Sequence, residues 1–396
     1  MKEGCAAKNI LLVTPMLDQG GLEKVCVMTA RLLQPFFRVT IAVFDGRGIV
    51  YDVTGLDVID LKLPSSPSKI GKVLNVFRRA GKLRKLKRNL KIDLSYGFGP
   101  TANISNVMGK GREKIYSSMH SYLDLLNVRR MRLYATRSDR LVCCSALIAK
   151  GASEQFPGKT VSVLYNPYDL EEIRRKAEEG CARFPWEDRG NDKIPLIVSM
   201  GREDDVKGFW HLIKAFAEIK RQGYPARLMI IGEGTFQEYK KLAGDLGVLR
   251  DVFFTGVQKN PYPYLKKADI YVLSSLNEGF PNALVEAMTL SVPVVATNCK
   301  SGPAEILMKN DRELALENYM DAEYGILLPE LGREKNLDSR VLEPEEAVMA
   351  EAVISLLRNR EKCGHYGEQA RLRVEEFSDT IYAKKLTGMM QEDGIV

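Results

Sequence analysis

The sequence has no apolar run of about 18 residues, the length that a membrane-spanning helix needs. At the N-terminus, MKEGCAAKNILLVTP holds only a short apolar stretch, which reads as a first strand and not as a signal peptide. These two absences predict a chain that is neither exported nor membrane-spanning.

Particular groupings of cysteine and aspartate are missing as well. The seven cysteines form no Cys-x-x-Cys pair, and Cys143 and Cys144 are adjacent, which suits neither a disulfide framework nor a zinc site. No Asp-x-Asp triplet occurs, so a metal-held pyrophosphate has no obvious pair of ligands. We therefore expect small buried cysteines, a reducing cytoplasm and no bound metal or other cofactor.

Length and charge predict two domains of different character. At 396 residues the chain exceeds a single ordinary core, which stops growing at about 250–300 residues. Residues 1–168 carry 27 Lys and Arg against 12 Asp and Glu, whereas the remaining residues carry 31 against 39. The first part should therefore attract an anionic partner, and the second should not.

Short β-rich runs alternate with helical periodicity in both halves, as in NILLVTP before LEKVCVMTARLL and PLIVSMG before FWHLIKAFAEIK. This alternation predicts an α/β fold with a mainly parallel sheet in each half. We expect a first domain at 1–168, a charge-dense linker at 169–193 and a second domain at 194–375. A C-terminal helix at 376–396 could cross back to the first domain, and residues 309–345 look like a polar excursion.

The segment EGFPNALVEAM places two carboxylates around the start of a helix. Proline is tolerated at the first helical position and not in the interior, so Pro281 predicts a helix that begins near residues 281–283. Glu278 then lies in the preceding loop, and Glu286 lies about one turn inside the helix.

Between the two glutamates lie uncapped backbone N–H groups at the positive end of the helix, those of Gly279, Phe280 and Asn282. The two carboxylates can accept hydrogen bonds from hydroxyl groups, and the N–H groups between them form a phosphate-binding site. This combination would match a ligand that contains a sugar, a diphosphate and a ribose. The alternative is a solvated loop glutamate and a first-turn glutamate favoured by the helix dipole.

A second loop, SMGREDDVKGFWHLI, also follows a strand and precedes a helix. It brings Arg202 and Lys207 together at the carboxyl end of the strand, where two cations can neutralise a diphosphate leaving group. The alternative, two exposed charges in a surface loop, is less common beside glycines that permit close approach, here Gly201 and Gly208.

Five segments together resemble the retaining family 4 glycosyltransferases of the GT-B fold, also called glycosyl transferases group 1. They are EGFPNALVE, Gly201-Arg202 followed by Lys207-Gly208, LMIIGEG, FTGV and PVVATNCKSGPAEIL. The resemblance covers most of the second half in the expected order and implies two facing Rossmann-like, doubly wound domains with an interdomain cleft. The sequence departs from the family pattern at Leu22 and in a charged insert around 176–193, neither of which touches the expected donor site.

The resemblance also implies roles for individual residues. Glu286 would hold the ribose hydroxyls of the donor nucleotide, and Glu278 would face the hydroxyls of the transferred sugar. Arg202 and Lys207 would grip the diphosphate. Residues around the helix start and the close-approach glycine would complete donor binding, namely Gly201, Gly279, Phe280, Pro281 and Asn282.

In the first half, PMLDQGGLEKVCV follows a strand, and family members have a similar glycine loop facing the donor phosphates and the acceptor. Gly20 and Gly21 would let the backbone approach that ligand, although a plain helix-entry turn is the alternative. His120 lies just past the strand KIYSSM, where relatives keep a functional histidine. It would bond a sugar hydroxyl or assist proton movement from the acceptor, unless it is structural, as we expect His211 and His365 to be.

Residues 69–91 carry ten Lys or Arg and no acidic residue. Apolar residues recur at near-helical spacing, at Ile70, Val73, Leu74, Phe77, Leu83, Leu86 and Leu90. A basic amphipathic helix predicts an anionic membrane surface, as does a second cluster at Arg129, Arg130 and Arg132. The alternative is that the apolar stripe packs on the sheet while the lysines face water. No nucleic acid is expected, because the segment has no aromatic interleaving and no nucleic-acid motif.

These observations predict a retaining glycosyltransferase that moves a hexosyl or N-acetylhexosaminyl group from a nucleotide-diphosphate sugar, with UDP the expected nucleotide. The acceptor would be a lipid-linked or polysaccharide hydroxyl in surface glycan assembly, at the cytoplasmic face of the cell membrane. The rivals are another GT-B enzyme, such as a sugar epimerase or phosphorylase, and a silent subunit that binds nucleotide sugar or membrane.

The segment GEGTFQ resembles the glycine fingerprint of dinucleotide-binding proteins but does not match it, because Gln237 replaces the third glycine.

Overall fold

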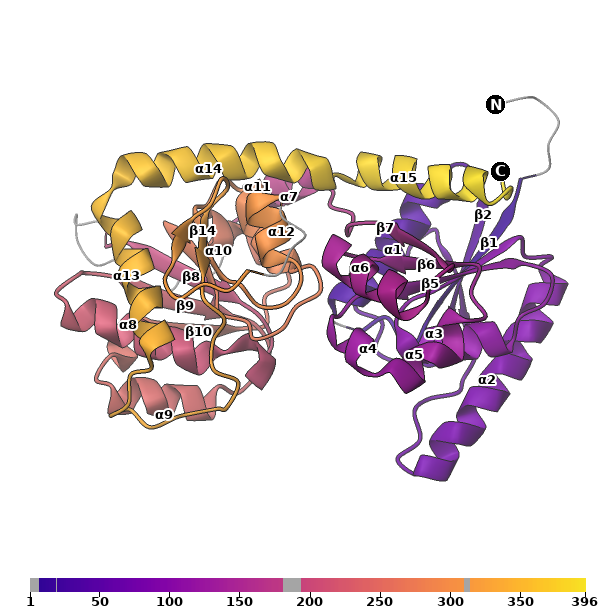
Figure 1. The fold of residues 1–396 in the computed structure, drawn as a ribbon, viewed down its shortest axis with the longest axis horizontal. Helices are drawn as coiled ribbons and strands as arrows, with labels where there is room; N and C mark the ends of the chain where they lie inside the picture. Colours follow the sequence, from indigo (N-terminus) through magenta and orange to yellow (C-terminus); the bar gives the residue numbers. More distant parts are fainter. Residues whose placement is uncertain (1–6, 19, 181–193, 310–313) are drawn as a thin grey trace. The chain divides into compact units, whose positions relative to one another are not determined.

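The structure is a computed structural model that describes residues 7–18, 20–180, 194–309 and 314–396. Its contacts divide the chain into two compact units (Figure 1). Unit 1 comprises Met1–Tyr168 and Phe377–Val396, and unit 2 comprises Asp169–Glu376. Each unit has its own sheet and its own core, and each is described by itself below.

Unit 1 holds a seven-stranded parallel sheet in the order β3-β2-β1-β4-β5-β6-β7. The strands are β1 (Asn9–Thr14), β2 (Arg38–Val43), β3 (Asp57–Asp60), β4 (Leu94–Gly97), β5 (Lys114–Met119), β6 (Arg140–Cys143) and β7 (Thr160–Val163). Its helices are α1 (Gly21–Leu33), α2 (Lys69–Asn89), α3 (Pro100–Met108), α4 (Leu123–Leu126), α5 (Val128–Ala135), α6 (Ala146–Gln155) and α15 (Asp379–Glu392).

Alternate residues of β1 feed two different cores, as the period of two in a strand requires. Ile10 and Leu12 are buried with residues of α1 and α15, whereas Leu11 and Val13 are buried with residues of α2 and α3. A parallel sheet covered on both faces explains why these strands are continuously apolar in sequence.

Unit 2 repeats this plan in the order β10-β9-β8-β11-β12-β14-β13, with β13 alone antiparallel. The strands are β8 (Leu196–Met200), β9 (Arg227–Ile231), β10 (Val252–Gly256), β11 (Ile270–Leu273), β12 (Val294–Thr297), β13 (Met320–Asp321) and β14 (Ile326–Leu328). The helices are α7 (Leu170–Ala177), α8 (Phe209–Arg221), α9 (Gln237–Asp245), α10 (Tyr262–Lys266), α11 (Asn282–Thr289), α12 (Pro303–Met308), α13 (Pro344–Arg358) and α14 (Arg360–Val374).

The predicted α/β class with two doubly wound parallel sheets is confirmed. Each sheet has a switch point at which the strand order reverses, between β1 and β4 in unit 1 and between β8 and β11 in unit 2. Ligands of such sheets bind outside the carboxyl ends of the strands at that switch point. The loops after these four strands are therefore the places to search for chemistry.

Two sequence-based boundaries need correction. The expected linker at 169–193 begins with helix α7, which belongs to unit 2 because Leu170 and Ile173 are buried and the Asn260 side-chain amide donates to the Lys176 carbonyl. The rest of that linker, 181–193, lies outside the described residues. The expected polar excursion contains β13 and β14, and all three residues of β14 are buried.

Within the described residues, no helix combines the length and the apolar character that crossing a bilayer requires.

Candidate active site

The loops after β8 and β11 bring a lysine and a glutamate together at the switch point of unit 2. Lys207 Nζ lies 2.7 Å from Glu278 Oε1, and the two side chains are 27% and 13% exposed. Burial disfavours the ammonium ion, but the Glu278 carboxylate outweighs this effect and raises the pKa of Lys207 above its ordinary value. Two residues 71 positions apart thus form one partly buried ion pair.

Lys207 is held in place by the end of β11. Its carbonyl accepts a hydrogen bond of 2.9 Å from Ser274 Oγ, and the Leu276 N–H donates to the Val206 carbonyl at 2.7 Å. Gly208 has a φ of 58°, and a Cβ there would lie 2.2 Å from the Ser274 carbonyl oxygen. Only glycine fits this approach, which fixes where Lys207 points.

Two further residues of the loop lie close to Lys207. The Lys207 side chain packs over Gly201, where a Cβ would lie 3.1 Å from Lys207 Cδ. Arg202 is exposed, and its positive charge acts on the ammonium of Lys207. Two neighbouring cations of this kind offer a site for a diphosphate.

Glu286 lies on α11 as a buried carboxylate, 6% exposed. The prediction that the helix begins near 281–283 is confirmed: Asn282 is its first residue, and Pro281 precedes it with a φ of −71°. Glu278 lies in the loop, as expected. The hydroxyl of Tyr262 donates to Glu286 Oε1 over 3.4 Å.

The loop after β12 supports the segment between the two glutamates. Ser301 Oγ donates to the Gly279 carbonyl at 2.8 Å. At Gly302, whose φ is 99°, a Cβ would lie 2.6 Å from Pro281 Cδ. Phe280 is buried beside this contact. The backbone before α11 is therefore fixed from the neighbouring strand.

Sequence reasoning missed one carboxylate of this site. Glu203 Oε2 accepts backbone N–H groups of Thr235 at 2.7 Å and Phe236 at 2.9 Å, which ties the loop after β9 to the loop after β8. A Cβ at Gly232 would lie 1.8 Å from the Gly201 carbonyl oxygen. The glycines of GEGTFQ therefore allow close packing between the two loops. Their spacing was the sequence signal that could have pointed to Glu203.

In unit 1, His120 follows β5 directly and its ring stacks on Phe98 with 6.3 Å between ring centroids. Burial lowers the pKa of His120 to about 4, and a hydrogen bond with Asn166 offsets this only in part. The ring is therefore neutral at pH 7, and its buried Nε2 has no hydrogen-bond partner among the described residues. Asp124, which the sequence did not single out, lies nearby, and burial raises its pKa to about 6.

The glycine loop after β1 packs against its own unit. The Tyr51 hydroxyl donates to the Gly20 carbonyl at 2.6 Å and accepts from the Gly20 N–H at 3.2 Å. Gly21 is the first residue of α1. Unit 1 thus presents Gly20, Gly21 and His120, while unit 2 carries the other predicted site residues, and the interdomain cleft stays a prediction.

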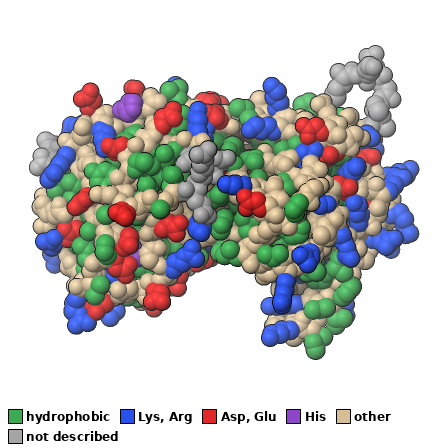
Figure 2. Space-filling model, viewed as in Figure 1, with side chains coloured by type: hydrophobic (Ala, Val, Ile, Leu, Met, Phe, Trp, Pro, Cys, Tyr) green, Lys and Arg blue, Asp and Glu red, His purple; other side chains and the backbone are tan. Residues whose placement is uncertain are grey.

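The two halves of helix α2 lie in different surroundings, and the membrane interpretation stays a prediction. The first half keeps four apolar side chains exposed: Ile70 76%, Val73 58%, Leu74 48% and Phe77 59%. The second half packs into unit 1 through the fully buried Leu83. Figure 1 shows the first half projecting from unit 1, and in Figure 2 hydrophobic and basic side chains gather on that projection.

Two of the basic residues of α2 do not face water, contrary to the packing alternative. The Arg79 guanidinium donates to the Leu63 carbonyl, and Lys87 Nζ lies 2.9 Å from Glu113 in a pair that is 2% exposed on both sides. Burial lowers the pKa of Lys87 to about 8, against the attraction of Glu113. These buried contacts fix the second half of the helix.

Comparison with known proteins gives a consistent result. The model of the family "Glycosyl transferases group 1" matches residues 183–326. An uncharacterized glycosyltransferase of Methanocaldococcus jannaschii is 30% identical over 207 residues, which is 50% of this chain and 50% of that protein. The chain thus spans half the length of this relative.

Two further proteins match over most of their length. The N-acetylgalactosamine-N,N'-diacetylbacillosaminyl-diphospho-undecaprenol 4-alpha-N-acetylgalactosaminyltransferase of Campylobacter jejuni is 29% identical over 330 residues, 79% of this chain and 83% of the relative. The crystal structure of Anabaena HepE in complex with UDP and glucose has a TM-score of 0.71 at 16% identity, covering 97% and 100% of the two chains. At that identity the structure shows a shared fold.

Proposed function

We propose that this protein, whose residues 183–326 match the family model of the glycosyl transferases group 1, moves a hexosyl or N-acetylhexosaminyl group from a UDP-sugar to an acceptor hydroxyl, with retention at the anomeric carbon. The acceptor is a lipid-linked or polysaccharide hydroxyl in surface glycan assembly. The Campylobacter relative, whose name contains a diphospho-undecaprenol acceptor, supports this class.

The Lys207–Glu278 pair beside the buried Glu286 carries the proposal. Lys207 and the exposed Arg202 neutralise the charge that develops on the leaving diphosphate. Glu278 accepts hydroxyl groups of the transferred sugar, and Glu286 accepts the ribose hydroxyls. This division of labour needs no metal ion, since two side-chain cations meet the diphosphate.

Retention follows from attack on the face that the diphosphate leaves. The bond between the anomeric carbon and the diphosphate oxygen breaks as the acceptor oxygen bonds to the same carbon. The acceptor proton passes to the leaving phosphate, so no protein nucleophile is required. His120, neutral at pH 7, would bond the acceptor hydroxyl and orient it.

Thermal unfolding in EDTA with UDP, GDP or ADP tests the donor site. A ligand at ~100 times its Kd adds about 2.7 kcal/mol to the free energy of unfolding, so UDP should raise the Tm of the wild type. Glu286→Ala should lose most of this rise, and Glu278→Ala should keep UDP binding but lose sugar transfer. Glu351→Ala, at an exposed position of α13, is the control.

Two results would contradict the proposal. If no nucleotide raises the Tm of the wild type, the site does not bind a nucleotide donor. If Glu278→Ala abolishes UDP binding while Glu286→Ala affects only turnover, the roles of the two glutamates are reversed.

The anionic surface of the cell membrane, at its cytoplasmic face, is the partner we propose for unit 1. The exposed apolar residues of α2 lie at i, i+3, i+4 and i+7, starting from Ile70, and form one stripe along the helix. Exposed Lys69, Lys72 and Arg78 flank this stripe and complement anionic lipid headgroups.

A further inference from the structure

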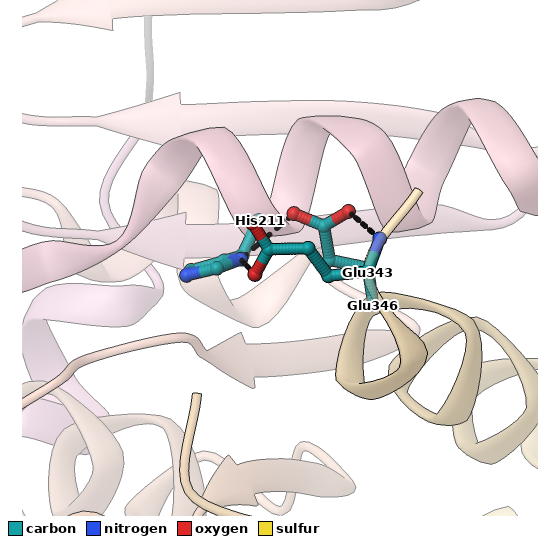
Figure 3. Close-up of side chains that lie close together, drawn as sticks. All are labelled: His211, Glu343 and Glu346. Carbon is teal, nitrogen blue, oxygen red and sulfur yellow. Dashed lines mark hydrogen bonds and ion pairs between the residues drawn. The ribbon is translucent and has the colours of Figure 1, made fainter. Parts of the chain in front are cut away.

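A buried hydrogen-bonded network joins the start of α8 to the start of α13 (Figure 3). His211 Nε2 lies 2.9 Å from the Gly332 carbonyl oxygen, and His211 Nδ1 lies 2.8 Å from Glu346 Oε1. The side chains of His211 and Glu346 are fully buried. Figure 3 shows the imidazole of His211 and the carboxylates of Glu343 and Glu346 pointing toward one another.

The partners of His211 determine where its protons are. A carbonyl oxygen can only accept, so Nε2 must donate to Gly332. The ammonium of Lys214, 1% exposed, lies 3.8 Å from Glu346 Oε1, close enough to attract a negative charge on that oxygen. An ionised Glu346 accepts from Nδ1, and in this arrangement both ring nitrogens of His211 carry a proton.

Glu346 has no oxygen left over in this arrangement. Its Oε2 accepts the Glu343 N–H at 2.8 Å, and the Glu343 side chain caps the start of α13 in return. The Asn336 side-chain amide donates to Glu343 Oε1 at 3.3 Å. Both ring nitrogens of His211 and both oxygens of Glu346 are thus hydrogen-bonded, which fixes these two side chains in one arrangement.

The network reaches the candidate diphosphate site through α8. His211 lies in the first turn of α8, four residues after Lys207, and its N–H donates to the Gly208 carbonyl at 3.1 Å. On the other side of Lys207, the Lys335 ammonium pairs with Asp205 at 2.8 Å. The segment 332–346 therefore contacts the chain on both sides of Lys207, at Asp205 before it and at His211 after it.

We propose that doubly protonated His211, held by the Gly332 carbonyl and Glu346, is a positioning residue for Lys207 and that UDP affinity depends on it. The inference rests on the proposed function, since it assigns UDP to the site that contains Lys207. His211 touches no ligand in this scheme and acts by holding the helix turn that follows Lys207.

The same side chains are also a candidate metal site, and the network speaks against that use. Ligand atoms of His211, Glu343 and Glu346 lie within 4.8 Å of one another, the one such group among the described residues. A cation there would have to displace the proton on Nδ1 and would face the ammonium of Lys214. In the proposed protonation state, the positive charges of His211 and Lys214 already balance the carboxylates of Glu343 and Glu346.

The test combines calorimetry and NMR on the full chain. UDP affinity is measured for the wild type, His211→Gln and Glu346→Gln in EDTA, below the onset of unfolding. His365→Gln, at an exposed position of α14 in the same unit, is the matched control. Imidazole ¹⁵N spectra of the wild type at pH 7.5 report ring protonation, and the signal absent from His211→Gln is His211, since the chain has three histidines.

We expect both ring nitrogens of His211 to be protonated. The His211→Gln and Glu346→Gln variants should bind UDP about fivefold more weakly than the wild type, the scale of couplings through a packed network. His365→Gln should bind as the wild type does.

Three outcomes would overturn the inference. The first is that the wild type binds UDP and the folded His211→Gln variant binds it with the same affinity. A second is a singly protonated His211 in the wild type. The third is that Zn²⁺ or Mg²⁺ in EDTA-free buffer raises the Tm of the wild type but not that of the His211→Gln variant. If the wild type binds no nucleotide at all, the proposed function fails and this inference fails with it.

Discussion

At the residue scale, the position of Lys207 depends on Gly208, because its left-handed backbone and its close approach to β11 admit no side chain. The sequence predicted that Lys207 and Glu278 lie in loops at the same sheet edge. It did not predict their ion pair, because that contact joins residues 71 positions apart in the chain and depends on how β8 and β11 align. Glu203 was missed for the same reason, since its partners lie on another loop.

Gly208→Ala should lower both stability and UDP affinity. A left-handed backbone costs a non-glycine residue about 1–2 kcal/mol, and here the added Cβ would also meet the Ser274 carbonyl oxygen at 2.2 Å. Gly223→Ala is the matched control, since Gly223 has a φ of 84° with no atom within 4 Å of an added Cβ.

Chemical denaturation and UDP titration of the two glycine variants separate strain from the clash. Gly208→Ala should be the less stable of the two and should alone lose UDP affinity. Equal stability and equal affinity in both variants would show that the contact with β11 does not position Lys207.

At the element scale, α2 shows what a periodic pattern can and cannot reveal. The apolar spacing predicted a helix across 69–91, and α2 spans Lys69–Asn89. The same spacing runs without a break through both halves, so it could not show that Leu83 packs in the core while Phe77 is exposed. Burial is decided by what the rest of the fold places against each turn.

Replacing the four exposed apolar residues of α2 by serine should release the protein from vesicles. Each large apolar side chain that enters a bilayer contributes about 1.5–3 kcal/mol, so the loss of Ile70, Val73, Leu74 and Phe77 should abolish sedimentation with anionic vesicles. Glutamine at Lys69, Lys72 and Arg78 should weaken binding by about 1 kcal/mol per charge and reduce its salt dependence.

The vesicle experiment needs a control for exposed apolar surface in general. Serine at Leu249 and Val257, which are 45% and 51% exposed in unit 2, should leave sedimentation unchanged. Equal sedimentation of the wild type and the α2 serine variant with anionic vesicles would rule out the membrane role of this helix.

At the scale of the whole molecule, the last helix secures unit 1 although it comes after unit 2 in the chain. Arg140 Nε donates to Asp393 Oδ2 at 2.8 Å, and the Tyr116 hydroxyl donates to the same oxygen at 2.5 Å. The hydroxyl of Tyr382 on α15 lies 2.7 Å from the hydroxyl of Thr29 on α1. The sequence could raise this return only as a possibility, because the contacts join residues more than 250 positions apart.

Asp393→Asn should destabilise unit 1 in a way that depends on pH. Burial alone would raise the pKa of Asp393, but the hydrogen bonds from Arg140 and Tyr116 outweigh it and lower the pKa below its ordinary value. A carboxyl whose pKa falls on folding stabilises the protein above its unfolded pKa, and this contribution is lost as pH falls through the folded pKa.

Denaturation of the wild type and Asp393→Asn between neutral and acid pH checks the sign. At pH 7 the variant should be less stable by about 1–3 kcal/mol, the cost of weakening a partly buried charged contact. The difference should shrink in acid, below the ordinary titration range of aspartic acid. A difference that is constant with pH would show that the Asp393 charge does not contribute.

The division of the chain has a consequence for its synthesis. Unit 2 is an insertion within unit 1, whose fold draws on Met1–Tyr168 and again on Phe377–Val396. During translation, every residue of unit 2 leaves the ribosome before α15 does. The face of unit 1 that packs against α15 therefore stays uncovered while unit 2 is synthesised. Unit 1 begins to form first, but it can complete its core only after unit 2 has been made.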